Sequence, residues 1–542
     1  MKSLQALLIT FIILSTLPTF GQSKQNEKAV NRVDSLFNYL YQKNKTGAAF
    51  AILKNGKTIY KNTKGLANVE YQISITDSTV FNIASISKQF TTYVALILEE
   101  EGKLSFKDDI RKHLPELAHL PHKITIKQLT NHTHGLPNVD DLARLKNVQR
   151  MAHWQVVQMA LNIQQTNFIP GEKYQYGNTA YVLLTEIIKR VGKKSFEAQL
   201  KEKIFTPLRM KSSQANGYAS GVIANKAVSY NVFNNHYIYN PIELETMGSS
   251  GVYTNINDMI LWAKHYYNTI VGNQSFYSKM KAATKLNSGK KIKYGMGLQF
   301  DNYKGIDVVF HGGGTASYRS YILHVPAYNL SFVFLANSGG FSGLDMIYKS
   351  LDFVLEKFIQ NDQPKKITYT NKELQKFTGI YEQSPGNYYT IFTEKNNLFF
   401  KTYGSNEKVL LPVLEKSIFK FALPYSKFVF SKDKLNFIIG DFNYECKKIS
   451  INPPKIEAVK LSDFIGIYRN KAHQITLELI LDNNNLKVKQ VFNDSFTLNP
   501  LTKTSFYAQG FGKLDFTIDS NKDIHGFKIS GANFRNIEFK KK

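Results

Sequence analysis

The spacing of apolar residues divides the chain into two parts, and the first part predicts a mixed fold. Helical spacing from residue 29 gives way to strand-like alternation at Ala48–Leu53 and Thr58–Asn62, with Asn55-Gly56 between them as a hairpin turn. A long region of helical patterns then runs to about residue 264. Strand patterns return at residues 307–310, 318–324 and 330–335, before a closing helix over 346–358. This order predicts an α+β fold, in which an antiparallel sheet is flanked by helices and joined to an all-helical region.

The last third of the chain repeats itself and predicts two all-β units. The segment Leu374–Tyr381 recurs 87 residues later as Leu461–Tyr468, with leucine, phenylalanine, glycine and tyrosine in the same places. A second segment, Asn396–Lys401, has an echo in Asn484–Lys489. Short aromatic and β-branched runs between polar turns are typical of small barrels or sandwiches. We therefore expect β-repeats over residues 371–455 and 456–542, after a first domain over residues 22–362 that ends at a linker of residues 363–366.

The composition supports a folded, multi-domain protein and narrows its partners. The 542 residues exceed one compact domain, and contents of 43% hydrophobic and 13% aromatic residues exclude a mainly disordered chain. The formal net charge of +27 comes mostly from lysine, because only nine of the 69 basic residues are arginine. These lysines are scattered, whereas nucleic-acid-binding proteins cluster their charge and favour arginine. We expect a solvated basic surface and no nucleic-acid partner.

The N-terminus has the pattern of a secretory signal peptide. Lys2 precedes the apolar run Leu7–Leu14, and a small residue, Gly21, follows at a suitable cleavage point. The alternative is an uncleaved anchor, but the run is shorter than the ~20 residues that a membrane span requires. We therefore expect cleavage after residue 21, export to the periplasm or the outside, and no integral membrane span afterwards. The single cysteine, Cys446, has no partner for an intramolecular disulfide.

Three short motifs in the first domain carry the candidate chemistry. Ser85 and Lys88 form S-x-x-K, a spacing that lets the amine reach the hydroxyl on one face of a helix. Tyr176 and Asn178 form Y-x-N, where a phenol near an ammonium would ionise more easily and act as a base. His311 precedes three glycines at the end of a predicted strand, where a substrate can approach the backbone. Taken singly, S-x-x-K could be a chance match, the tyrosine of Y-x-N an ordinary turn residue, and the glycines after His311 a glycine bulge.

In this order, the motifs resemble those of the serine β-lactamase and penicillin-binding protein superfamily, on its class C and D-Ala-D-Ala carboxypeptidase side. Flanking segments are similar to family motifs as well: 129–137 (L-T-N-H-T-H-G-L-P), 170–184, 205–210 and 247–253. The resemblance covers about residues 29–360. The chain departs from the family pattern at His134, where the family has Ser, at Arg209, where it has Gly, and at His311, where β-lactamases have Lys. A neutral imidazole holds a substrate carboxylate less firmly than an ammonium, which disfavours an efficient β-lactamase.

The resemblance implies a role for each candidate residue. Ser85 is the expected nucleophile, and Lys88 and Tyr176 are the expected acid–base groups, with the choice of acylation base left open. The expected substrate-binding residues are Asn178, His311, Gly313 and Gly314. The N–H groups of Ser85 and Gly314 would form the oxyanion hole. No metal or organic cofactor is expected: the pair His132/His134 has the spacing of metal ligands but falls on a structural loop of the family.

The expected activity is that of a secreted serine hydrolase that forms an acyl-enzyme on Ser85. Its substrates would be small amides or esters such as D-amino-acid peptides or esters, with peptidoglycan fragments among the candidates. Two alternatives are a true β-lactamase and a slowly acylated penicillin-binding sensor or envelope-binding protein. The β-repeats keep the sensor hypothesis open, because they resemble the lipocalin-like or eight-stranded barrels appended to D-aminopeptidase-type members of the family.

Overall fold

The structure is a computed structural model that describes residues 27–542 except 149, 218–220, 235, 342, 360–366, 384–385, 422–425, 440–441, 452, 455–458, 490–494, 522 and 532. The signal peptide predicted over residues 1–21 and the linker predicted at residues 363–366 lie outside the described residues. No helix in the described part of the chain is long and apolar enough to cross a membrane.

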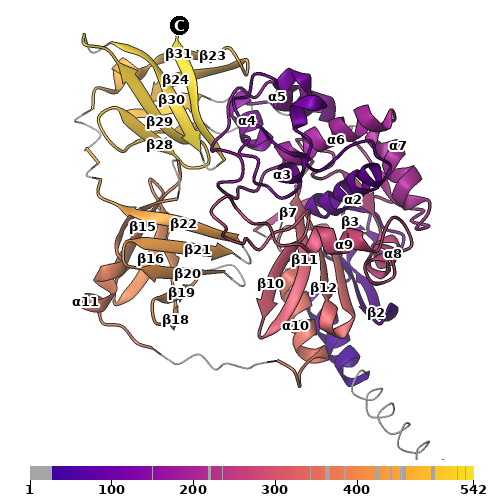
Figure 1. The fold of residues 1–542 in the computed structure, drawn as a ribbon. Helices are drawn as coiled ribbons and strands as arrows, with labels where there is room; N and C mark the ends of the chain where they lie inside the picture. Colours follow the sequence, from indigo (N-terminus) through magenta and orange to yellow (C-terminus); the bar gives the residue numbers. More distant parts are fainter. Residues whose placement is uncertain are drawn as a thin grey trace, which may run out of the picture.

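A six-stranded antiparallel sheet is the centre of the first part of the chain (Figure 1). Its order is β10-β11-β12-β13-β1-β2. The strands are β1 (Ala48–Lys54), β2 (Lys57–Lys64), β10 (Gln299–Tyr303), β11 (Ile306–Thr315), β12 (Tyr318–Val325) and β13 (Leu330–Ala336). The predicted antiparallel sheet is confirmed, with β1 paired to β13 so that both ends of this segment meet in one sheet. The edge strand β10 has a mixed polar sequence and escapes the pattern analysis.

Helices cover both faces of this sheet. Successive residues of a strand point to opposite faces, and in β1 the residues on both faces are apolar. Along β1, Ala48, Phe50 and Ile52 pack with the helix over residues 27–40 and with α10 (Gly343–Val354). The intervening Ala49, Ala51 and Leu53 belong to the separate cluster that contains α2 (Ser87–Glu100) and α8 (Ile256–Tyr267). A strand buried on both sides in this way reads as a continuous apolar run, as β1 does.

The helical region between β2 and β10 is built around α2. Most of α2 is buried, including the polar residues of its first half, which is typical of a helix at the centre of a bundle. The helices α6 (Thr179–Gly192) and α7 (Phe196–Leu200) pack directly on α2. The region also contains α3 (Ile126–Thr130), α4 (Val139–Lys146), α5 (His153–Leu161) and α9 (Ser275–Lys281). Short strands connect them: β3 (Leu66–Asn68), β4 (Ile73–Ser74), β5 (Phe81–Asn82), β6 (Gln214–Ala215), β7 (Tyr230–Phe233), β8 (His236–Tyr239) and β9 (Val252–Thr254).

Arg209 shows how the chain tolerates one departure from the family pattern. Its φ is 59°, in the left-handed region that favours glycine, which is the residue that the resembled family has there. The Arg209 N–H donates to the Thr206 carbonyl (3.0 Å), and the next N–H, of Met210, donates to the Phe205 carbonyl (2.8 Å). The loop therefore keeps the glycine conformation with an arginine in place.

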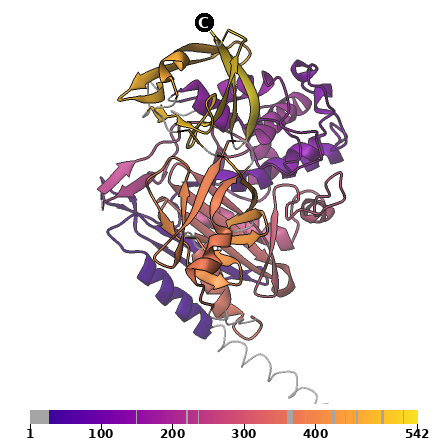
Figure 2. The same ribbon diagram turned by 90° about the vertical axis from the view of Figure 1, so that its left-hand side faces the viewer.

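Two nine-stranded antiparallel sheets follow, with the same connectivity (Figures 1 and 2). The first, after α11 (Asn371–Leu374), contains β14 (Gly379–Glu382), β15 (Tyr388–Glu394), β16 (Asn397–Thr402), β17 (Val409–Leu410), β18 (Val413–Glu415), β19 (Ile418–Lys420), β20 (Ser426–Ser431), β21 (Lys434–Ile439) and β22 (Phe442–Ile449). The second contains β23 (Gly466–Asn470), β24 (Ile475–Asp482), β25 (Asn485–Lys489), β26 (Phe496–Thr497), β27 (Asn499–Pro500), β28 (Ser505–Ala508), β29 (Gly512–Ile518), β30 (Ile524–Gly531) and β31 (Phe534–Lys541).

Each of these sheets curls until its edges meet. The edge strands of the first sheet, β17 and β18, are separated by only two residues, and those of the second, β26 and β27, by one. Edges joined by so short a segment must lie side by side, so each sheet is nearly a closed barrel. If the two edge strands of a sheet are counted as one interrupted strand, each barrel has eight strands. The predicted pair of all-β barrels is confirmed, whereas the exact domain boundaries stay predictions.

The repeated sequence motif has a physical reason. In the first barrel the Tyr381 hydroxyl donates to the Phe377 carbonyl (2.9 Å), and in the second Tyr468 donates to Phe464 (2.8 Å). The glycine two residues before each tyrosine has a φ of 144° or 148°, which a side chain rarely adopts. The motif therefore anchors the first strand of each barrel by a buried tyrosine.

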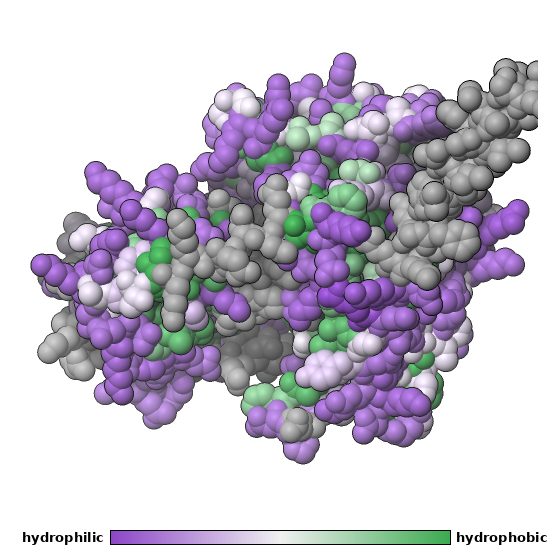
Figure 3. All heavy atoms as spheres, turned by 90° about the horizontal axis from the view of Figure 1, so that it is seen from below, coloured by the Kyte–Doolittle hydropathy of each residue, from purple (hydrophilic) through white to green (hydrophobic). Residues whose placement is uncertain are grey.

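The molecular surface agrees with a solvated, basic protein. The face shown in Figure 3 is mainly hydrophilic, with apolar residues in small separate groups. Ion pairs such as Lys194–Glu202 (2.6 Å) have both side chains more than half exposed. Exposed pairs of this kind contribute only ~0–1 kcal/mol each, so the apolar clusters carry most of the stability.

Candidate active site

The predicted nucleophile Ser85 lies in a short 3-10 turn, Ala84–Ile86, that leads directly into α2. The turn is strained, because Ala84 has a φ of 47°, a left-handed conformation that residues other than glycine rarely adopt. A hydrogen bond from the Ala84 N–H to Asn82 Oδ1 (2.7 Å) supports this conformation. Such strain is common at active sites, and here it occurs one residue before the hydroxyl.

Lys88 lies one helical turn after Ser85 and is fully buried. Its Nζ is 3.2 Å from Ser85 Oγ, 2.9 Å from Asn178 Oδ1 and 2.9 Å from the Ser249 carbonyl oxygen. Ser249 belongs to a tight turn between Gly248 and Gly251, whose φ angles are 87° and 81°. The segment 247–253, singled out in the sequence only by resemblance, thus supplies a main-chain partner for the amine.

Burial gives Lys88 and Tyr176 opposite acid–base properties. Loss of solvation lowers the pKa of Lys88 to about 7, and the charge of Asp140 offsets this only in part. Burial raises the pKa of Tyr176, although a hydrogen bond with Ser85 lowers it somewhat. The Lys88 amine lies 4.8 Å from the centre of the Tyr176 ring. Burial therefore opposes the easier ionisation that a nearby ammonium is expected to give this phenol, and the acid–base roles of Lys88 and Tyr176 stay predictions.

Asn178 connects Lys88 to a carboxylate that the sequence analysis missed. It is the N-terminal cap residue of α6, and its backbone N–H donates to Asn138 Oδ1 (2.9 Å). Its Oδ1 accepts from Lys88, while its Nδ2 donates to Asp140 Oδ2 at 2.5 Å. Asp140 follows the motif L-T-N-H-T-H-G-L-P by three residues, and an acidic residue so near a site loop is the signal that could have found it.

His311 lies in a chain of neutral hydrogen-bonding groups. Burial, helped by the charge of Lys88, lowers its pKa to about 3, so the ring is neutral. Its Nδ1 is 2.6 Å from the Gly312 carbonyl and therefore carries the proton, which leaves Nε2 to accept from the Tyr294 hydroxyl at 3.1 Å. The same hydroxyl is 3.2 Å from His132 Nε2. Sequence analysis missed Tyr294, since no motif surrounds it.

The two histidines of the H-x-H pair are both engaged in structural contacts. His132 bonds Tyr294 as described, and His134 Nδ1 accepts the Leu136 N–H at 2.9 Å. Burial lowers the pKa of both rings. Within the described residues, no three His, Cys, Asp or Glu side chains are grouped as metal ligands.

The glycines after His311 bring β11 against the turn that carries Ser85. β10 pairs with β11 only as far as Phe310, so no strand of the described chain pairs with residues 311–315 on that edge. A Cβ on Gly313 would lie 2.4 Å from the Ile83 carbonyl oxygen and 3.1 Å from the Ala84 Cβ. Gly313 therefore packs against the turn, whereas Gly314 and Thr315 line the cleft.

A cleft of about 730 Å³ opens beside these residues. Asn178, Asp140 and Gly314 line it from the first part of the chain, and Phe496 lines it from the second barrel. Tyr444 of the first barrel lies near enough to Tyr176 to raise the pKa of that phenol. In Figures 1 and 2 both barrels lie against this side of the molecule. Residues of the central sheet, of the helices and of the second barrel therefore line the cleft, and Tyr444 of the first barrel lies near Tyr176.

The second barrel is also bonded to the start of α4 (Val139–Lys146), the helix that carries Asp140. Asn533, between β30 and β31, donates from Nδ2 to Asp141 Oδ2 (3.0 Å). Its carbonyl accepts from the Asn138 N–H (3.0 Å) and from Asn167 Nδ2 (2.9 Å). The cleft wall around Asp140 thus depends on a residue of the repeat that the sequence analysis treated as accessory.

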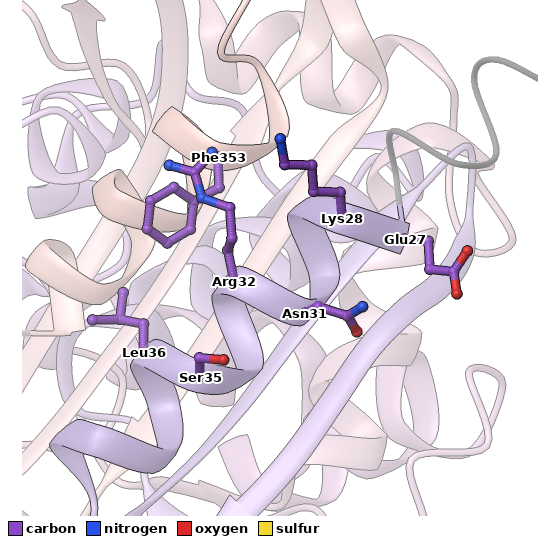
Figure 4. Close-up of a pocket in the computed structure, with 7 residues that line it drawn as sticks. All are labelled: Glu27, Lys28, Asn31, Arg32, Ser35, Leu36 and Phe353. Atoms are coloured by element: carbon purple, nitrogen blue, oxygen red, sulfur yellow. The ribbon is translucent and has the colours of Figure 1, made fainter.

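A second hollow, of about 710 Å³, lies beside the first described helix of the chain (Figure 4). It is lined by the helix over residues 27–40 and by Phe353 of α10, with the Arg32 guanidinium 4.1 Å from the Phe353 ring centre. None of the predicted site residues lines this hollow. Asn178 and Gly314 line the cleft of about 730 Å³, whereas Ser85, Lys88, Tyr176 and His311 are not among its described lining residues. That cleft is the candidate active site, because Asn178 bonds the Lys88 amine that contacts Ser85.

The comparison with known families agrees with this geometry. A model of the beta-lactamase family matches residues 28–352, more than half of the chain. The chain belongs to the beta-lactamase family. As a member, it is a serine hydrolase by type, with the mixed sheet-and-helix fold described above.

Relatives of this beta-lactamase-family protein extend the likeness past the family match. Penicillin-binding protein 4* of Bacillus subtilis (strain 168) is 25% identical over 431 residues, which is 74% of this chain and 93% of that protein. D-aminopeptidase of Gluconobacter oxydans (strain 621H) is 28% identical over 302 residues, and the match spans 54% of this chain and only 55% of that protein. The first alignment is too long to end at residue 352 and so includes part of the barrels.

A solved structure supports the fold. The octameric penicillin-binding protein homologue from Pyrococcus abyssi superposes with a TM-score of 0.55 at 23% identity, covering 77% of this chain and all of that one. At this identity the likeness concerns the fold alone.

Proposed function

We propose that this protein is an exported serine hydrolase that cleaves amide or ester bonds of small substrates, such as D-amino-acid peptides, through an acyl-enzyme on Ser85. The observation that carries the proposal is the Lys88 amine, 3.2 Å from Ser85 Oγ, with its pKa lowered by burial to about 7. A buried amine that is partly neutral near pH 7 is suited to be a general base. Export is supported by the signal-peptide pattern at the N-terminus.

In this mechanism, neutral Lys88 accepts the Ser85 proton as Oγ attacks the substrate carbonyl carbon. The N–H groups of Ser85 and Gly314 hold the oxyanion, and each such donor is worth about 3–4 kcal/mol in comparable enzymes. The proton passes to the leaving group, directly or through the Tyr176 hydroxyl, which bonds Ser85. Water then attacks the acyl-enzyme, and Lys88 serves again as base. Asn178 retains a second amide hydrogen for the substrate carbonyl.

His311 supports a substrate class without a strongly bound carboxylate. A neutral, buried imidazole whose two nitrogens are both engaged offers no positive charge. β-Lactams and peptides that end in D-Ala-D-Ala carry a carboxylate that a cation would normally hold. The likeness to a D-aminopeptidase supports D-amino-acid amides and peptides instead, with peptidoglycan fragments as one possible source.

Turnover of a substrate panel tests the proposal. Purified protein is assayed with p-nitrophenyl esters, D-alanine peptides and amides, and nitrocefin, with Ser85→Ala as the control. We expect hydrolysis of esters and D-amino-acid amides, slow or no hydrolysis of nitrocefin, and loss of all turnover in Ser85→Ala. Rapid nitrocefin turnover would favour a β-lactamase, and stable acylation without turnover would favour a sensor.

A further inference from the structure

Asp140 is a carboxylate in the cleft that the proposed acyl-transfer steps do not use. It is the second residue of α4 (Val139–Lys146) and lines the cleft together with Asn178 and Gly314. Its Oδ2 accepts two amide donors, from Asn178 at 2.5 Å and from Asn138 at 3.3 Å. Among the described residues no donor reaches its Oδ1. One oxygen is thus fixed, and the other is available to a ligand.

The surroundings of Asp140 leave its charge incompletely compensated. Lys88 is the nearest cation that affects it, but Asn178 lies between the two groups and bonds both. Burial raises the pKa of Asp140 and the neighbouring Asp141 adds to this effect, while bonds from the two asparagines and the charge of Lys88 oppose it. A half-buried carboxylate of this kind is stabilised by a cation that reaches its open oxygen.

We propose that Asp140 binds the α-ammonium group of the substrate, so that the enzyme selects D-amino-acid amides and peptides with a free amino terminus. Asn178 gives the geometric link, because it contacts both Lys88, next to the reacting Ser85, and Asp140. An α-ammonium is separated from the reacting carbonyl carbon by one carbon atom. A substrate whose carbonyl is at Ser85 can therefore place its ammonium beside the neighbouring carboxylate. This inference rests on the proposed function and names its substrate class.

The inference makes Asp140 a specificity residue. The alternative is that Asp140 only positions Asn178. The two are separated by Asp140→Asn, which keeps an amide oxygen to accept from Asn178 but removes the negative charge. A positioning role predicts equal effects on all substrates. An ammonium-binding role predicts a larger effect on substrates that carry the ammonium.

The test compares two substrates that differ only in the ammonium: D-alanine p-nitroanilide and propionyl p-nitroanilide. We expect the wild-type kcat/KM to favour the D-alanine compound. In Asp140→Asn the ratio of the D-alanine value to the propionyl value should fall at least ~30-fold, as when one partner of a charge pair is removed. The ratio is compared because the Asp140 charge also acts on Lys88, which serves both substrates. Glu243→Gln is the matched control: this carboxylate also lines the cleft but bonds neither Asn178 nor Lys88 among the described residues, so the ratio of the two values should not change.

If neither anilide is turned over, the corresponding primary amides are compared as ligands. D-Alaninamide should then slow labelling of Ser85 by a fluorophosphonate more than propionamide does, and Asp140→Asn should abolish the difference. The ammonium site is overturned if the wild type does not distinguish the two compounds, or if the loss in Asp140→Asn is equal for both. The Ser85→Ala control still shows separately whether the proposed function stands. Absence of any labelling at Ser85 would overturn both.

Discussion

Replacing Lys88 with methionine should lower the rate of Ser85 acylation by about 100-fold or more. Methionine fills a similar volume but accepts no proton, so the variant loses the amine that lies 3.2 Å from Ser85 Oγ. Removing a general base typically costs 10²–10⁴-fold. The measurement is the second-order rate of labelling by a fluorophosphonate, followed by intact-protein mass spectrometry.

The pH dependence of the same rate gives an independent check on Lys88. Its pKa is lowered to about 7, and the neutral amine, which is the reactive form, grows as pH rises. Acylation of the wild type should therefore increase about tenfold per pH unit below 7 and level off above it. In Lys88→Met this step should disappear. A wild-type rate that is flat between pH 5 and 9, or a variant that keeps the step, would assign the base to another group.

Replacing Gly313 with alanine should also lower acylation by about 100-fold, although Gly313 has no reactive group. The added Cβ would lie 2.4 Å from the Ile83 carbonyl oxygen and 2.4 Å from Ser320 Oγ. Because the carbonyl is main chain, β11 must move away from the turn that carries Ser85. The two oxyanion donors, on Ser85 and Gly314, then lose their spacing, and a displacement near 1 Å can cost about 100-fold.

The control for this variant is Gly340→Ala. Gly340 is exposed, and a Cβ there meets nothing within 4 Å. Both variants are labelled with the fluorophosphonate and melted in parallel. We expect Gly340→Ala to behave as the wild type, and Gly313→Ala to lose labelling while it still melts cooperatively. Normal labelling of Gly313→Ala would show that the approach of β11 to the turn does not position the site.

The sequence predicts those parts of the site that depend on short-range spacing. Ser85 and Lys88 are one helical turn apart, so any helix over these residues brings their side chains together. The order of motifs, read through the family resemblance, predicts Asn178 and His311 as substrate-binding residues. The structure brings both near Lys88, and their roles stay predictions. Tyr294 could not be predicted in this way, because it reaches the site through the packing of a distant segment and no motif marks it. Asp140 lies three residues after the motif 129–137, but that motif carries no information about the role of the residues that follow it.

The position of the barrels is a second feature that the sequence does not predict. The repeat of Leu374–Tyr381 at Leu461–Tyr468 predicts two similar β-units, since the same buried tyrosine bond is needed in each. It says nothing about where these units dock. Phe496, which lines the cleft, and Asn533, which bonds Asp141, belong to the second unit only. Neither position lies in a repeated motif. Docking depends on surface complementarity, which periodicity does not reveal.

The identity of the acylated residue tests the central claim most directly. Full-length protein is treated with a fluorophosphonate, or with a labelled D-amino-acid ester and rapid acid quench, and the modified peptide is mapped by mass spectrometry. The account predicts a single adduct on Ser85, absent in Ser85→Ala and slow to form in Lys88→Met. An adduct on another residue, or none on Ser85 in folded protein, would contradict it.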